Sequence, residues 1–134
     1  MNLLPAVVID TSAIIAILRA EPEAGDLSAR AVSYIRRLIS TATWLESAIV
    51  CESKVVRGGD FFDQLIAKFE IEIVPFSVTQ ARLAREAHRR YGKGRRNKAQ
   101  LSHGDCFVYA LAKELGAPVL FKGADFAQTD IEAA

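Results

Sequence analysis

Short apolar runs rich in β-branched residues alternate along this chain with longer segments of helical pattern. The runs are apolar throughout, which is typical of strands covered by helices on both faces. The segments between them are long enough to cross over to a parallel neighbour. The pattern therefore predicts an α/β domain with a mainly parallel sheet. Its expected strands are residues 6–9, 38–39, 71–74 and 118–121.

Helices are expected at residues 12–19, from Pro22 onward, and at 43–56, 60–69, 77–91 and 102–116. Thr43, Ser77 and Ser102 each stand three residues before an acidic or amide side chain, a spacing typical of helix N-caps. A Gly-Gly pair at 58–59 is expected to separate two helices, with Asp60 capping the second. We find no repeat and no linker in the 134 residues, so residues 1–134 are expected to form one domain.

Nothing in the sequence predicts export or a membrane span. The apolar run at residues 13–18 is far shorter than the roughly 20 residues that a bilayer requires. The run at residues 3–9 has no basic residue before it and ends at Asp10, unlike a signal peptide. Cys51 and Cys106 form no C-x-x-C pair and are expected to be buried thiols. We therefore expect a cytoplasmic protein.

Four acidic residues follow predicted strands or begin predicted helices, at the edge where open α/β sheets bind their ligands. They are Asp10, Glu46, Asp105 and Asp125. Taken singly, each could instead be a helix cap or a turn residue. Carboxylates that share one pocket raise one another's pKa, and a divalent cation removes that conflict. Oxygen ligands without Cys or His pairs suit Mg²⁺ or Mn²⁺.

The sequence around these acids resembles that of the PIN-domain ribonucleases and, within them, that of the VapC-like toxins of toxin–antitoxin pairs. The matching segments are residues 8–13, 43–46, 90–94, 104–113 and 116–130. The resemblance implies a three-layer α/β/α domain that binds Mg²⁺, or Mn²⁺, through the four acids, with Asp10 and Asp105 as the firmest ligands. It also implies that Ser12 lies near the metal and that Thr129 or Asp130 supports the outer shell.

The function implied by the resemblance is metal-dependent hydrolysis of RNA by an endoribonuclease that acts as a toxin. A metal held by carboxylates would activate water for attack on the phosphodiester. The expected partners are a VapB-like antitoxin and a second copy of the chain. Two alternatives stay open, a non-catalytic PIN-like RNA-binding module and a DNA nuclease with the same acidic site. A haloacid-dehalogenase type of phosphatase is set aside because position 12 is Ser rather than Asp.

The net charge of +1 hides a segregated distribution. No acidic residue stands between Glu86 and Asp105, whereas that interval contains six Lys or Arg residues. Without those six, the chain would hold 11 basic and 16 acidic residues. Cations at a helix C-terminus have a structural explanation, but four more on a Gly-containing loop suit a phosphate backbone better. The expected RNA contacts are Arg90, Lys93, Arg95, Arg96 and Lys98.

Overall fold

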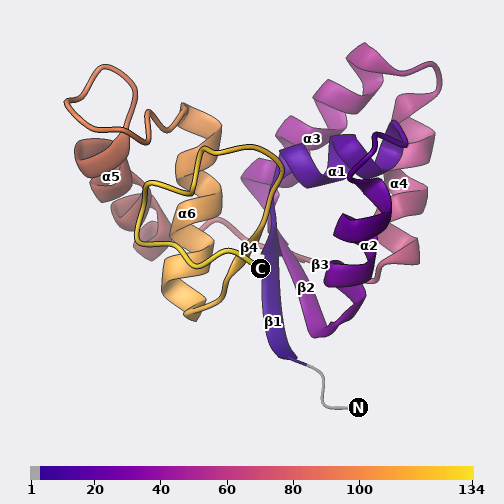
Figure 1. Ribbon diagram of the computed structural model, residues 1–134, viewed down its shortest axis with the longest axis horizontal. Helices are drawn as coiled ribbons and strands as arrows, with labels where there is room; N and C mark the ends of the chain where they lie inside the picture. Colours follow the sequence, from indigo (N-terminus) through magenta and orange to yellow (C-terminus); the bar gives the residue numbers. More distant parts are fainter. Residues whose placement is uncertain (1–3) are drawn as a thin grey trace.

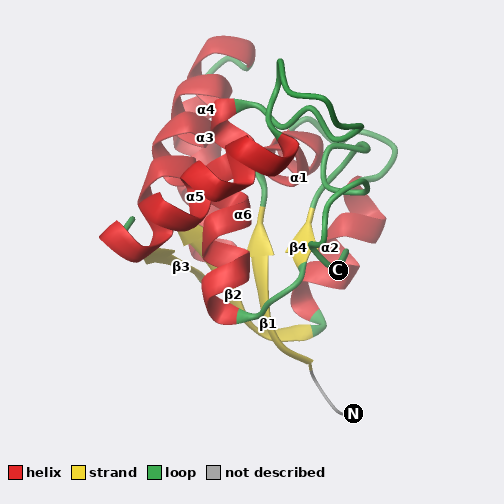
Figure 2. Ribbon diagram, turned by 90° about the vertical axis from the view of Figure 1, so that its left-hand side faces the viewer, coloured by secondary structure: helices red, strands yellow, loops and turns green. Residues whose placement is uncertain are grey.

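The computed structural model describes residues 4–134, and its centre is a four-stranded parallel sheet. The strand order is β3-β2-β1-β4. Their bounds are β1 (Leu4–Ile9), β2 (Tyr34–Ser40), β3 (Ile71–Val74) and β4 (Val119–Leu120). All three neighbouring pairs are parallel, so every carboxyl end lies at one loop-rich edge (Figure 2). Because β2 and β4 flank β1 on opposite sides, the loops after β1 and β4 diverge at a topological switch point.

Helices cover both faces of this sheet, as Figure 1 shows. One layer contains α1 (Thr11–Leu18), α2 (Ala24–Val32), α3 (Thr41–Lys54) and α4 (Gly58–Lys68). The other contains α5 (Val78–Tyr91) and α6 (His103–Leu115). Alternate β1 residues serve the two cores: Val7 and Ile9 pack with the first layer, and Val8 packs with the second. The expected three-layer α/β/α arrangement is confirmed.

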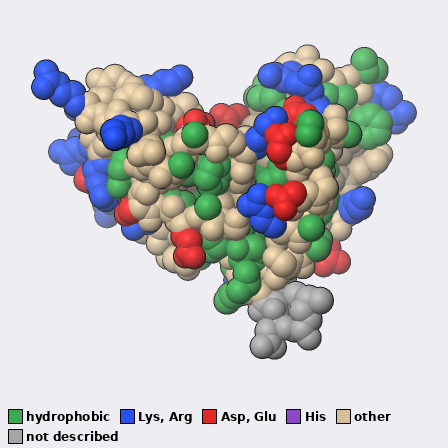
Figure 3. Space-filling model, viewed as in Figure 1, with side chains coloured by type: hydrophobic (Ala, Val, Ile, Leu, Met, Phe, Trp, Pro, Cys, Tyr) green, Lys and Arg blue, Asp and Glu red, His purple; other side chains and the backbone are tan. Residues whose placement is uncertain are grey.

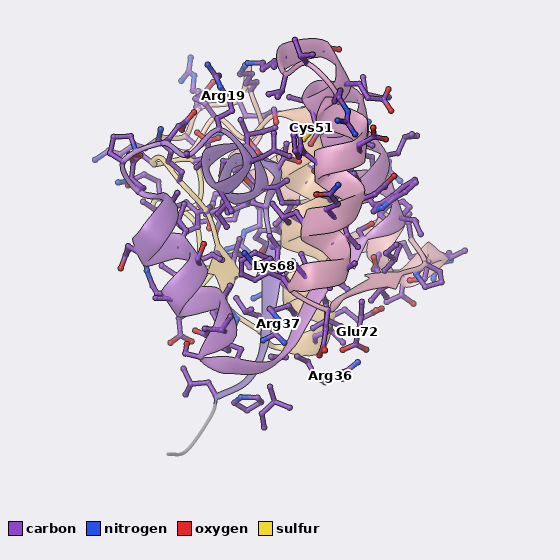
Figure 4. All side chains as sticks on the ribbon, turned by 90° about the vertical axis from the view of Figure 1, so that its right-hand side faces the viewer. Arg19, Arg36, Arg37, Cys51, Lys68 and Glu72 are labelled. Atoms are coloured by element: carbon purple, nitrogen blue, oxygen red, sulfur yellow. The ribbon has the colours of Figure 1, made fainter. Side chains whose placement is uncertain are left out.

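Strand β2 is longer than the sequence predicted, because it includes two arginines. The Arg36 guanidinium forms an ion pair with Glu72 on β3, with Nε 2.9 Å from Oε2 (Figure 4). Arg37 donates to the backbone carbonyls of Ala31, Tyr34 and Phe69. Both guanidinium groups therefore have hydrogen-bond partners. Because their charges are compensated in this way, the polar segment that contains them can belong to β2, which begins at Tyr34.

Two predicted helix starts were wrong. Helix α3 begins at Thr41, with Ser40 as its N-cap, so Thr43 is a buried residue inside the helix rather than a cap. Helix α4 begins at Gly58 rather than after Asp60. Gly58 approaches the preceding helix so closely that an added Cβ would lie 1.9 Å from the carbonyl oxygen of Cys51. Gly58 thus allows α4 to pack closely against α3, whereas a glycine pair in the sequence alone predicts a helix break.

The other two predicted caps are confirmed. The Ser77 side chain accepts from the backbone N–H of Gln80, and Ser102 forms a complete capping box with Asp105. Within residues 4–134, no helix has both the length and the apolar character that crossing a bilayer requires.

Candidate active site

Asp10 and Asp105 are two buried carboxylates at the carboxyl edge of the sheet. Asp10 follows β1 directly and caps α1, where its Oδ2 accepts from the backbone N–H of Ser12 at 3.0 Å and from its hydroxyl at 2.5 Å. Asp105 lies in the first turn of α6, and its Oδ2 accepts from the backbone N–H of Ser102 at 2.9 Å. Only 6% of Asp10 and 9% of Asp105 is exposed. Helix capping therefore fixes both carboxylates at this edge.

Glu46 approaches this pair from α3. Because α3 begins two residues earlier than expected, Glu46 lies in its second turn rather than its first. Thr11 donates its hydroxyl to Oε1 of Glu46 at 2.8 Å. Oε2 lies against the backbone of Gly104, where an added Cβ would come within 2.1 Å of it. Glu46 thus touches the helical turn that carries Asp105, and Thr11 and Gly104 shape the site although the sequence assigned them no role.

Asp125 is exposed on the loop after β4. Its charge acts on Asp105, whose pKa is raised by burial and then by Asp125 and Glu46, against the opposing effect of the Ser102 hydrogen bonds. Burial raises the pKa of Asp10 to about 6, and the charges of Asp105 and Glu46 contribute to the rise while the bonds from Ser12 oppose it. The four predicted acids therefore form one electrostatic cluster.

No Lys or Arg in residues 4–134 forms an ion pair with any of these four acids. The cluster fits a divalent cation by its uncompensated charge and by its oxygen donors. In the described part of the chain, no three side chains are already grouped as ligands around one point.

Of the three predicted supporting residues, Ser12 contacts one of the four acids, whereas Thr129 and Asp130 do not. Ser12 contacts Asp10, and its hydroxyl also accepts from the backbone N–H of Lys122 at 2.9 Å, which ties the loop after β4 to the site. Thr129 bonds to backbone atoms of its own turn. Asp130 accepts from Tyr109 at 2.8 Å and from Lys113 at 2.7 Å. Thr129 and Asp130 thus make their hydrogen bonds away from the four acids.

The basic loop, residues 92–101, follows α5 and is closed at its base. The backbone N–H of Lys93 donates to Leu101 at 2.9 Å, and that of Leu101 donates to Tyr91 at 2.7 Å. Arg90 differs from the other predicted RNA contacts, because its guanidinium already has partners within the fold. Its Cζ lies 4.8 Å from the centre of the Tyr91 ring, and its Nη1 lies 3.7 Å from Oδ2 of Asp130. The exposed cations of the loop itself are Lys93, Arg95, Arg96 and Lys98.

Figure 3 shows a notch between the two helical layers, with acidic side chains at its base. Lys and Arg side chains are visible on the lobe that carries α5 and the basic loop. The arrangement is an acidic centre at the switch point of a parallel sheet, with cations beside it. Such a combination defines a class of domains that can hold a divalent metal and approach a phosphodiester.

Residues 7–132 match the model of the PIN domain, and the chain belongs to this family. It is 48% identical to a protein named Ribonuclease VapC from Mycolicibacterium smegmatis, over 94% of this chain and 98% of that one. Ribonuclease VapC30 of Mycobacterium tuberculosis is 46% identical over 92% of this chain and 95% of its own. The expected family and the expected class of enzyme, a VapC-like ribonuclease, are confirmed.

A solved structure supports the fold independently. The crystal structure of VapC20 of Mycobacterium tuberculosis, described as a toxin that cleaves the sarcin–ricin loop, matches with a TM-score of 0.73. The match covers 96% of this chain and 98% of that chain, at 13% sequence identity. The three-layer arrangement is therefore shared between chains that have few residues in common.

Proposed function

We propose that this chain is a divalent-metal-dependent endoribonuclease that hydrolyses RNA phosphodiesters through its acidic cluster. The observation that carries the proposal is the burial of Asp10 and Asp105 at the switch point, with Glu46 beside them and no basic partner in residues 4–134. Buried carboxylates that only stabilised the fold would be paired with cations or fully hydrogen-bonded. The two aspartates accept hydrogen bonds from helix N-termini but pair with no cation in residues 4–134, so their negative charge remains available for a ligand.

The four acids have two kinds of role in this proposal. Asp10 and Asp105 would hold the metal, because their helix-capping bonds keep their oxygens at the edge of the sheet. Either Glu46, held by Thr11, or the exposed Asp125 orients the attacking water and accepts its proton. A bound Mg²⁺, or Mn²⁺, supplies the Lewis acidity that activates the water and offsets charge on the leaving oxygen. Ser12 keeps Asp10 in place.

The test is single-turnover cleavage of RNA by folded protein. Asp10→Asn and Asp105→Asn should each remove most of the activity, and EDTA should abolish it until Mg²⁺ or Mn²⁺ is added. Asp63→Asn provides a matched control, because Asp63 is exposed on α4 and lies outside the cluster. Undiminished cleavage by folded Asp10→Asn protein would overturn the proposal. Cleavage of DNA but not RNA would favour a DNA nuclease, and metal-independent binding without cleavage would favour a binding module.

We further propose that the activity serves as a cytoplasmic toxin, restrained by a VapB-like antitoxin, and that the chain forms a homodimer. The VapC names of its relatives support the toxin role through the resemblance to VapC-like toxins that the sequence carries. Expression without a partner should arrest growth, and co-expression of the cognate antitoxin should relieve the arrest. Asp105→Asn is the control, because it removes a proposed ligand. If the wild-type chain slows growth no more than this variant does, the toxin role is refuted in that host. Sedimentation of the purified protein tests the dimer.

A further inference from the structure

An apolar groove with a volume of about 690 Å³ lies between α5 and α6. We call it the α5–α6 groove. Its apolar wall includes Phe76, Ala84, Cys106 and Phe107. Burial raises the pKa of the Cys106 thiol to about 11. The thiol is therefore protonated at neutral pH, so Cys106 contributes apolar surface to the groove and is not a nucleophile. The proposed cleavage reaction assigns no role to this groove.

Aromatic rings line the groove. The ring of Phe107 lies edge-on to that of Phe76, with centroids 4.9 Å apart and planes at 90°. It is also edge-on to the ring of His103, at 4.8 Å and 85°. The groove therefore has an aromatic wall, and aromatic side chains stack with nucleobases with little dependence on sequence.

The charges around the groove have one sign. Arg85 on α5 and Lys93 of the basic loop line it together with His88 and His103, and no acidic residue of the described chain does so. Neither Arg85 nor Lys93 forms an ion pair within residues 4–134. An apolar aromatic wall with unpaired cations at its rim complements a molecule with a flat apolar part and an anionic part. A nucleotide has that combination in a single unit, whereas a peptide matches it only where an apolar and an acidic side chain stand together.

The groove also begins at the acidic cluster. Ser102 and His103 line it, and Ser102 is the residue that forms the capping box with Asp105. A base held in the groove therefore belongs to a nucleotide near the bond that the acidic cluster would cut. We propose that the α5–α6 groove is a base-binding subsite, which holds an unstacked nucleobase of the RNA substrate while Arg85 and Lys93 face its phosphates. This inference rests on the proposed ribonuclease function and extends it to substrate selection.

Filling the groove tests the proposal. Ala81 is exposed and lines the groove, so Ala81→Phe should occupy the space without disturbing the core. Ala67→Phe is the matched control, because Ala67 is exposed on α4 in the opposite layer. The substrate is a short single-stranded RNA that spans a bond cut by the wild-type protein. For Ala81→Phe we expect kcat/KM to fall about tenfold, within the range that loss of one base-stacking contact supports, and for Ala67→Phe we expect no change.

The decisive measurement pairs this variant with an altered RNA. A nucleotide without its base is placed, in turn, at each position on either side of the cut bond. At one of these positions, removing the base should lower kcat/KM of the wild-type protein about tenfold. The same RNA should cause no further fall in kcat/KM for Ala81→Phe, because the substitution and the missing base remove the same contact. Losses that multiply, or cleavage by Ala81→Phe at the wild-type rate, would overturn the proposal.

The cations provide a second test that leaves the groove open. Arg85→Gln should raise KM more than it lowers kcat, and Arg82→Gln, on the same helix but outside the groove, should change neither. If Ala81→Phe alters only the oligomeric state or the binding of an antitoxin, the groove is a protein-docking surface and the base-binding proposal is wrong. A wild-type protein that cuts no RNA would instead refute the proposed function itself, before any groove variant is compared.

Discussion

Replacing Asp10 with asparagine should make the metal-free protein more stable at neutral pH. In the folded chain, burial and the neighbouring carboxylates raise the pKa of Asp10 from 3.8 to about 6. Asparagine removes the charge but keeps an oxygen that can accept both hydrogen bonds from Ser12. The substitution therefore isolates the energetic cost of holding this charge at the edge of the sheet.

The sign and size of the effect follow from proton linkage. A carboxyl whose pKa is higher in the folded than in the unfolded state favours folding while it is protonated, and that advantage is lost as pH rises through the two pKa values. The shift from 3.8 to about 6 corresponds to about 3 kcal/mol at neutral pH. The new amide group needs a partner of its own, which reduces the gain to between about 1 and about 3 kcal/mol. Near pH 4 the folded-state carboxyl is protonated, which should lower the difference between the two proteins by about 2 kcal/mol.

Urea unfolding in EDTA, at about pH 7.5 and again at about pH 4, measures this difference directly. Asp63→Asn, on an exposed site, should leave the free energy of unfolding unchanged at both values. Added Mg²⁺ should stabilise the wild-type protein more than Asp10→Asn, because a ligand that binds only the folded state raises its stability. A variant no more stable than the wild type in EDTA at neutral pH would refute this reasoning, as would an equal gain at both pH values.

Two further substitutions test the surroundings of the cluster. Gly104→Ala should lower RNA cleavage in a folded protein, because the new Cβ would lie 2.1 Å from Oε2 of Glu46 and displace it; unchanged single-turnover rates would refute this. Changing the four exposed cations of the basic loop to Gln should weaken RNA binding, and each lost phosphate contact should reduce the log–log salt slope by about 0.7. Affinities at several salt concentrations decide this, and an unchanged slope would place the RNA path elsewhere. The four cations are Lys93, Arg95, Arg96 and Lys98.

The sequence predicted the fold wherever one local rule governed a segment. The central strand was recognised because helices bury both its faces and its residues are apolar throughout. Most of β2 was missed, since Arg36 and Arg37 are satisfied by Glu72 and by distant backbone carbonyls. The start of α4 was predicted wrongly for a similar reason. Gly58 was expected to precede this helix, but it is the first residue of α4 and packs against α3. These errors share one cause: the partner lies far away in the sequence or in another element.

The same distinction applies to the site. Asp10 and Asp105 were predictable because each follows a strand or begins a helix, and the structure has them there. The contact between Glu46 and Gly104 depends on how α3 packs against α6, which no local pattern predicts. Thr129 or Asp130 was expected to support the outer shell, and the Asp130 carboxylate accepts hydrogen bonds from Tyr109 and Lys113. The sequence thus indicated which acids are present, whereas packing determines which of them meet.

Helix capping does not exclude metal binding by the same acid, because one carboxylate can serve both. A helix N-terminus donates backbone N–H groups and carries partial positive charge, so it can hold a carboxylate in a fixed place without a cation. Asp10 and Asp105 each occupy such a position, and burial nevertheless raises the pKa of both. A lysine partner would relieve that cost and would also neutralise the charge that attracts a metal. Helix caps avoid this conflict, because they orient the oxygens and leave the negative charge available.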